Sequence, residues 1–334
     1  TAQSTTSNNF QLEGYIRDLE ITTTTSPTLS NGINLKAVYQ FEVANVYIHD
    51  LTGNGAQITC LLGDADAANN VAFRNCRIEN CDIGLNSNYA TNVVQPSFIK
   101  VDKCFFSGHT TAGWKYAGLQ GYCTNSAFAA MGCPGIWFWF TGTNNNQFTM
   151  TATSFENCGS ASYPSVQIDS LTSGAFSNVE IANTTQITTK PVYGVLMTST
   201  GLGQGQANVT WDNTYVRIGS SFTPMTMFSF GSTAYECRIT NTLWHTYDAA
   251  GQTRYYNVGA SNTVSNAFSQ VVQGTVAGTA LLPVNGANQN FALPLDGTSW
   301  IVSGPSGAFS FGGFTNGIDG RELILVNGSG QTMT

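Results

Sequence analysis

A short segment that recurs along the chain most constrains its fold. It is first seen at residues 71–81, where apolar and polar residues alternate and an Asn closes the run. Degenerate copies occupy residues 153–158, 179–183 and 237–241. Repeats of roughly 20–50 residues define a whole architecture, because each unit buries its apolar face only against its neighbours. The recurrence therefore predicts a stack of similar β units, without reference to any active site.

An alignment on the apolar residue before each turn gives one column of large side chains. Its members are Ile48, Ile78, Phe106, Phe128, Phe155, Ile181, Ile218 and Ile239. The residues two positions later are Asp50, Asn80, Gly108, Ala130, Asn157, Asn183, Ser220 and Asn241. Asn, Asp and Gly tolerate the left-handed backbone that sharp turns require. The two columns together predict a buried position followed by a sharp turn in every unit.

Short strand patterns at residues 33–38, 57–62 and 166–168 lie between these columns. Two or three short strands per repeat, without helical periodicity, are typical of a parallel β-helix. We predict an all-β chain, with a right-handed parallel β-helix over residues 1–257 and a small C-terminal β module over 258–334. The alternative is an antiparallel β-sandwich, which favours Asn-Gly or Asp-Gly hairpins. Those dipeptides stand mostly outside the repeat region.

The composition excludes several classes of partner. Charged residues make up only 9% of the 334 residues, and the formal net charge is −7. The Lys and Arg residues form no basic stripe, so we expect no nucleic-acid binding. No apolar run approaches the ~18–20 residues that span a bilayer, so we expect no membrane insertion, and residues 1–6 lack the features of a signal peptide.

The eight Cys residues show no zinc-ligand spacing. Several of them lie inside strand patterns, where a free Cys acts as a small core hydrophobe. We therefore predict buried free thiols, with one or two disulfides as the alternative. No metal site and no cofactor are expected.

Catalysis of glycoside hydrolysis would require a pair of carboxylates. Their separation is about 5 Å in retaining enzymes and about 6.5–9.5 Å in inverting ones, and rungs of a β-helix are ~4.8 Å apart. Asp102 and Glu156, about two rungs apart, form a candidate pair, with Asp169 as a third candidate. Glu79 shares a column with Glu156 but lies three rungs away, which is too far. The alternative is that these acidic groups only keep an outward face soluble.

Aromatic residues predict a binding surface. Residues 135–140 read Gly-Ile-Trp-Phe-Trp-Phe, with large apolar groups on both faces of one strand. We predict that Trp137 and Trp139 face outward, because indole is the more amphipathic group. Two such rings form an apolar platform ~7 Å long that suits sugar rings, and Trp114, one rung earlier, is predicted to join them. The alternative is burial under a loop or in a subunit interface.

The segment 75–85 and its copies resemble the pectin-lyase-like parallel β-helix superfamily. Residues 317–328, Gly-Ile-Asp-Gly-Arg-Glu-Leu-Ile-Leu-Val-Asn-Gly, resemble segments of bacteriophage tail spikes and tail fibres. The resemblance implies a homotrimer, on the virion tail or extracellular, that binds host-surface polysaccharide; many such proteins also depolymerise it. The superfamily's pectinase motifs are mostly absent, which argues against pectin-type chemistry. Two alternatives stay open: a monomeric secreted polysaccharide lyase or hydrolase, and a structural adhesin without catalysis.

Overall fold

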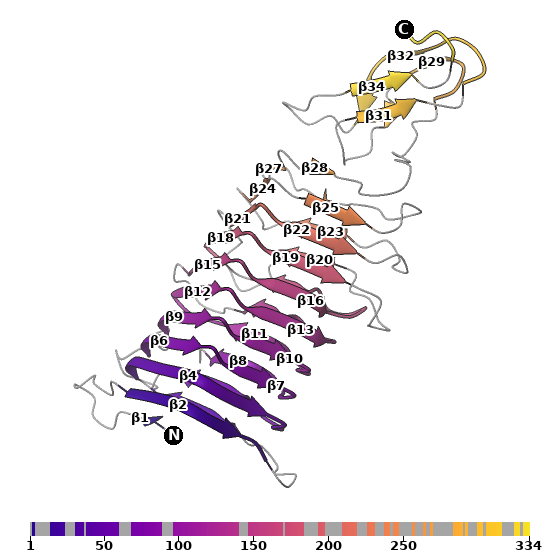
Figure 1. The fold of residues 1–334 in the computed structure, drawn as a ribbon. Helices are drawn as coiled ribbons and strands as arrows, with labels where there is room; N and C mark the ends of the chain where they lie inside the picture. Colours follow the sequence, from indigo (N-terminus) through magenta and orange to yellow (C-terminus); the bar gives the residue numbers. More distant parts are fainter. Residues whose placement is uncertain are drawn as a thin grey trace.

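The computed structural model describes most of the repeat region and parts of the C-terminal region (Figure 1). The described residues are 2–3, 14–23, 31–36, 38–59, 68–88, 96–139, 146–169, 171–183, 193–197, 209–218, 226–230, 237–240, 243–246, 256–257, 263–264, 268–269, 283–289, 291–292, 299–302, 305–315, 324–327 and 330–334. Within these ranges all regular secondary structure is β-strand.

Successive strands stack along one axis, from β2 (Gly14–Ile21) near the N-terminus to β28 (Phe268–Ser269) (Figure 1). The paired strands run parallel, and each strand from β6 to β25 pairs with the third strand after it. Among the described residues the only antiparallel contact is an isolated bridge between Ser160 and Tyr163. The prediction of a parallel β-helix is confirmed, and the antiparallel sandwich is excluded.

The strands form three ladders, which the chain visits in turn. Ladder 1 contains β6 (Asn69–Arg74), β9 (Ser97–Asp102), β12 (Gln120–Thr124), β15 (Gln147–Thr151), β18 (Ser173–Ser177), β21 (Val209–Asp212), β24 (Arg238–Thr240) and β27 (Thr263–Val264). Ladder 2 contains β7 (Arg77–Glu79), β10 (Phe105–Ser107), β13 (Ala127–Met131), β16 (Ser154–Cys158), β19 (Glu180–Asn183), β22 (Tyr215–Ile218), β25 (Leu243–Thr246) and β28.

Ladder 3 is a separate ten-stranded sheet. It contains β1 (Ala2–Gln3), β3 (Ile33–Lys36), β5 (Ala56–Thr59), β8 (Ile83–Asn88), β11 (Ala112–Tyr116), β14 (Ile136–Phe138), β17 (Val166–Ile168), β20 (Tyr193–Met197), β23 (Thr226–Phe230) and β26 (Tyr256–Asn257). Ladders 1 and 2 are joined at the N-terminal end, because β4 (Tyr39–His49) pairs with β6 at its start and with β7 at its end.

The turn after ladder 2 has the predicted left-handed backbone. Positive φ angles occur at Asp50, Asn80, Gly108, Ala130 and Asn157. The Asn80 amide donates to Asp50 Oδ1 over 2.9 Å, so the stacked turns are also hydrogen-bonded to each other at this step. Asn183 departs from the pattern because its φ angle is not positive. Ser220 and Asn241 lie outside the described residues.

A second set of left-handed turns separates ladder 1 from ladder 2. Its members are Asp18, Asn45, Asn75, Lys103, Asn125, Ala152, Asn178 and Asn213. The Asn75 amide donates to Asn45 Oδ1 over 2.8 Å, and the Asn45 amide donates to Asp18 Oδ1 over 2.9 Å. Lys103 and Ala152 interrupt this series because their side chains carry no amide. The same residue types thus serve two different corners of each rung.

The predicted buried column holds from Ile48 to Ile181, whose members pair in register and are buried. Its last two members are wrong. Ile181 pairs with Val216, while Ile218 pairs with Asn183. Ile239 pairs with Trp211 in ladder 1. Residues two apart share one face of a strand, so the hydrophobic pattern alone leaves a two-residue shift undecided.

Stacked aromatic rings fill the middle of the core. The rings of Phe106 and Phe128 lie 4.8 Å apart, and those of Phe128 and Phe155 lie 5.1 Å apart, nearly parallel in both cases.

Seven cysteines are buried free thiols, as predicted: Cys76, Cys81, Cys104, Cys123, Cys133, Cys158 and Cys237. Cys60 lies outside the described residues.

Near the C-terminus the same topology recurs on a small scale. β29 (Gly286–Asn288), β30 (Phe291–Ala292) and β31 (Ser299–Val302) pair in parallel with β32 (Phe309–Phe311), β33 (Phe314–Thr315) and β34 (Ile324–Asn327), respectively. The main stack continues to Ser269 through β27 and β28. The division of the chain at residue 257 stays a prediction.

Candidate functional site

The Trp pair lies on the outer face of ladder 3. Along β14 and the residue after it the side chains alternate, with Ile136 and Phe138 buried and Trp137 and Trp139 half-exposed. This is the orientation that the sequence predicts. The two-residue period of a strand places the two sets on opposite faces, and Ile136 lies on the inward face beside the buried Trp114.

Lys115 joins these two rings from the preceding rung. It pairs with Trp137 across β11 and β14. Its Nζ lies 4.8 Å from the ring centroid of Trp137 and 4.0 Å from that of Trp139, within the range of cation–π attraction. Desolvation lowers the pKa of Lys115, while Asp82 and Asp169 act in the opposite direction. The ammonium group is therefore half-buried between two aromatic faces.

Asp169 holds Trp137 from the following rung. The indole Nε1–H donates to Asp169 Oδ2 over 2.7 Å. Gln167 Nε2 lies 3.0 and 3.1 Å from the two carboxylate oxygens, and Asp169 itself is only 3% exposed. We call Lys115, Trp137, Trp139, Gln167 and Asp169 the aromatic–lysine surface. In it Asp169 fixes the orientation of one ring, and its predicted catalytic role stays a prediction.

Trp114 does not belong to this surface, and its predicted place there is wrong. Its side chain is fully buried, and its indole Nε1–H donates to Ser87 Oγ over 3.1 Å. It packs edge-on against Tyr116 and Phe148 in the core. The strand register explains the difference: Trp114 pairs with Ile136, an inward position. Lys115 is the residue of β11 that faces outward beside the Trp pair.

The other two carboxylate candidates lie on different ladders. Asp102 ends β9 in ladder 1, where its Oδ1 accepts hydrogen bonds from Thr124 Oγ1 (2.8 Å) and Asn125 Nδ2 (3.2 Å). Glu156 is exposed on β16 in ladder 2. Glu79 and Glu156 share a column three rungs apart, as predicted. Each of the three candidate carboxylates thus stands on a different ladder, with different neighbours.

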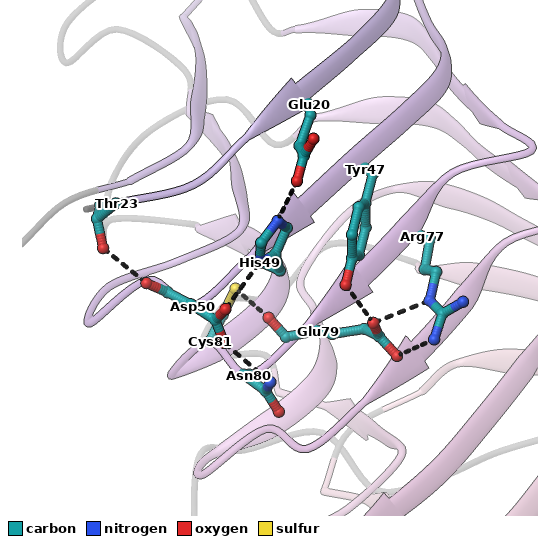
Figure 2. A network of polar contacts seen from close by, with 9 residues as sticks. All are labelled: Glu20, Thr23, Tyr47, His49, Asp50, Arg77, Glu79, Asn80 and Cys81. Atoms are coloured by element: carbon teal, nitrogen blue, oxygen red, sulfur yellow. Dashed lines mark hydrogen bonds and ion pairs between the residues drawn. The ribbon is translucent and has the colours of Figure 1, made fainter.

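A separate polar network covers the outer face of ladder 2 near the N-terminal end (Figure 2). At its centre is Glu79, which pairs with the Arg77 guanidinium at 2.8 Å. Tyr47 OH and Ser107 Oγ each donate to the same carboxylate over 2.8 Å. Burial opposes ionisation, but these hydrogen bonds outweigh it and hold the pKa of Glu79 below its usual range. Glu79 is therefore a saturated, ionised acceptor linking adjacent rungs.

His49 forms the second part of this network (Figure 2). Its Nδ1 lies 2.7 Å from Asp50 Oδ2, and its Nε2 lies 2.7 Å from Glu20 Oε1. The hydrogen bonds to Asp50 and then to Glu20 raise the pKa of His49. The imidazole also stacks on Tyr47, with ring centroids 4.2 Å apart. His49 thus connects β2 to β4 through a charged contact.

We expect this contact to make stability depend on pH. Because the folded-state pKa of His49 is raised, its contribution is full below the unfolded value of ~6.5 and is lost as pH rises through the folded value. Glu20→Gln should lower the pKa of His49, which an NMR titration of its imidazole measures. The free energy of unfolding should then fall less steeply as the pH rises from the unfolded to the folded pKa of His49. Glu156→Gln, which removes an exposed carboxylate elsewhere on ladder 2, is the control. An unchanged His49 pKa in Glu20→Gln would show that the contact does not form in solution.

Among the described residues, no group of three or more His, Cys, Asp or Glu side chains is arranged to hold a metal ion. A search of the same residues for a helix long and apolar enough to cross a membrane finds none.

Comparisons with known proteins concern the fold alone. No family model matches the sequence, and no curated protein matches it significantly. The A-module of Azotobacter vinelandii mannuronan C-5 epimerase is 13% identical with a TM-score of 0.46, and the match covers 78% of this chain and 58% of that one. The catalytic domain of a GH87 α-1,3-glucanase is 14% identical with a TM-score of 0.40, covering 75% and 53%.

Gene product 12 of bacteriophage phi29 is 16% identical with a TM-score of 0.33, covering 84% of this chain and 48% of that one. The present chain therefore spans between 48% and 58% of the length of these proteins. These values describe a partial likeness of architecture, from which nothing about ligand or reaction follows.

Sequence reasoning found the Trp pair but missed Lys115 and the role of Asp169. The signal for Lys115 was its place directly after Trp114, because residues adjacent on a strand face opposite sides. The polar network was missed because its members come from four consecutive rungs, on β2, β4, β7 and β10, and they face each other only once the register is known.

Proposed function

We propose that this chain is the β-helical part of a virion tail-spike or tail-fibre protein that binds host-surface polysaccharide. The observation that supports this most is the outward Trp137–Trp139 pair, fixed by Lys115 and Asp169. Half-buried indole rings held in place lose little entropy on binding, and their accessible parts offer flat apolar surface to sugar rings. The proposal includes a homotrimer on the virion tail or in the extracellular space.

The arrangement of these residues supports ligand binding more directly than it supports catalysis. Asp169 is engaged with the Trp137 indole and with Gln167, and the other two carboxylate candidates stand on other ladders. We propose depolymerisation of the bound polysaccharide only as a second activity, in addition to binding. Release of new reducing ends from a bound glycan by the wild-type protein would support it. Binding without such release would favour the non-catalytic adhesin.

The test is affinity electrophoresis in native gels that contain dextran, dextran sulfate, hyaluronan or bacterial lipopolysaccharide. We expect at least one polymer to retard the protein and Trp139→Ala to weaken that retardation at least about tenfold, as for a central Trp of a binding surface. Tyr15→Ala removes another exposed aromatic side chain, on β2, and is the matched control. Equal loss in both variants, or no retardation by any polymer, would refute the glycan-binding proposal.

The oligomeric state is tested separately by light scattering coupled to size exclusion. We expect a mass near three times the 35.6 kDa of the chain. A monomer would count against the spike or fibre and favour the secreted lyase or hydrolase.

A further inference from the structure

We propose that the aromatic–lysine surface takes a sugar that carries an anionic substituent, a carboxylate or a sulfate, which pairs with the Lys115 ammonium group. The inference rests on the proposed glycan-binding function and narrows its ligand class. It is carried by the position of Lys115 Nζ between two half-exposed indole rings.

The Lys115 ammonium group has no acceptor among the described residues. None of the carboxylates lies within 4.0 Å of its Nζ, and no hydrogen bond from it is formed there. Cation–π attraction holds the group in place, and its N–H donors stay open to solvent or to a ligand, because no described residue accepts from them. A partly desolvated cation in this state gains more from an anionic acceptor than an exposed one would.

Asp82 and Asp169 are the two carboxylates whose charges raise the pKa of Lys115. Both accept hydrogen bonds from other side chains. Asp82 Oδ1 accepts hydrogen bonds from Thr110 Oγ1 and Thr111 Oγ1 over 2.8 and 2.6 Å. Asp169 accepts from Trp137 and Gln167. Both carboxylates are engaged by donors other than Lys115, so the ammonium group stays available to a ligand.

Neutral amides flank Lys115 along the ladder and complete a sugar site. Asn86 pairs with Lys115 on one side of its rung, and Gln167 pairs with Trp137 on the other. Both side chains are half-exposed. The Asn86 amide can donate and accept, as sugar hydroxyl groups do, while the Gln167 amide, whose Nε2 donates to Asp169, can accept through its Oε1. The surface thus offers stacking from the indole rings, hydrogen bonds from the amides and one cation.

The experiment uses matched pairs of polymers that differ in charge. The full chain is run through native gels containing hyaluronan or carboxyl-reduced hyaluronan, which separates the carboxylate, and dextran sulfate or dextran, which separates the sulfate. We expect stronger retardation by the charged member of at least one pair. Lys115→Met, which keeps an apolar stem of similar length, should weaken that retardation about tenfold or more, as loss of a charge-assisted hydrogen bond does.

Two variants separate ligand contact from a structural role. Lys115→Arg keeps the charge over the rings and should restore most of the binding, while Lys100→Met removes a half-exposed lysine of ladder 1 and should change nothing. Far-UV circular dichroism of Lys115→Met should match the wild type.

The outcomes distinguish this inference from the function on which it rests. Equal retardation by charged and neutral members, or full binding by Lys115→Met, overturns the anionic ligand and leaves glycan binding standing. Retardation by none of the polymers, lipopolysaccharide included, overturns the glycan-binding function as well.

Discussion

Replacement of Phe128 by Ala should lower the free energy of unfolding by about 3–5 kcal/mol. Phe128 is fully buried in the middle of the ring stack, between Phe106 and Phe155. Truncation removes contacts on both ring faces at once. The neighbouring rings are held by their own rungs, so the cavity cannot collapse easily. Urea titration of wild type and variant, monitored by circular dichroism, measures the difference.

Phe98→Ala provides the matched control for this experiment. It makes the same chemical change on ladder 1, where the Phe98 side chain is 40% exposed. We expect a loss below about 1 kcal/mol there, because little apolar surface returns to water. A loss of similar size in both variants would contradict the stacked core.

Gly84→Ala should destabilise the protein by about 3 kcal/mol, at the upper end of the range for overpacking. A Cβ at position 84 would lie 2.5 Å from the Gly113 carbonyl oxygen, 2.7 Å from His109 Nε2 and 2.8 Å from Phe106 Cδ1. The first of these atoms belongs to the backbone of the next rung and cannot rotate away. Relief would require the two rungs to separate, which would break the ladder hydrogen bonds between them.

Gly84 belongs to a column of glycines that stack where the chain enters ladder 3. Its members are Gly32, Gly55, Gly84, Gly113 and Gly135, and a Cβ on any of the first four would meet the carbonyl oxygen of the next at 2.5–2.7 Å. Gly132→Ala is the control, because a Cβ there meets nothing within 4 Å. Its unfolding midpoint in urea should stay near that of the wild type. A tolerated Gly84→Ala would show that the rungs are not packed at this spacing.

The candidate site was predictable in part. The alternation in residues 135–140 predicted correctly that Trp137 and Trp139 face outward, because a strand with one buried face must expose its other set. The prediction that Trp114 joins this pair was wrong, because a position one rung away does not determine which face of the strand a side chain occupies. Lys115 and Asp169 reach the pair from the rungs before and after it, and sequence separation hides such contacts.

The sequence by itself determined the architecture: short alternating strands closed by Asn, Asp or Gly can bury their apolar faces only by stacking, whatever the exact register. The tertiary structure decided the rest. It set the pairing of Ile181 with Val216, the burial of Trp114 and the placement of Lys115 between two indole rings. The physical reason is that a pattern with a period of two specifies the face of a residue within its own strand. The neighbour across the ladder depends on the number of residues between successive strands, which varies along the chain.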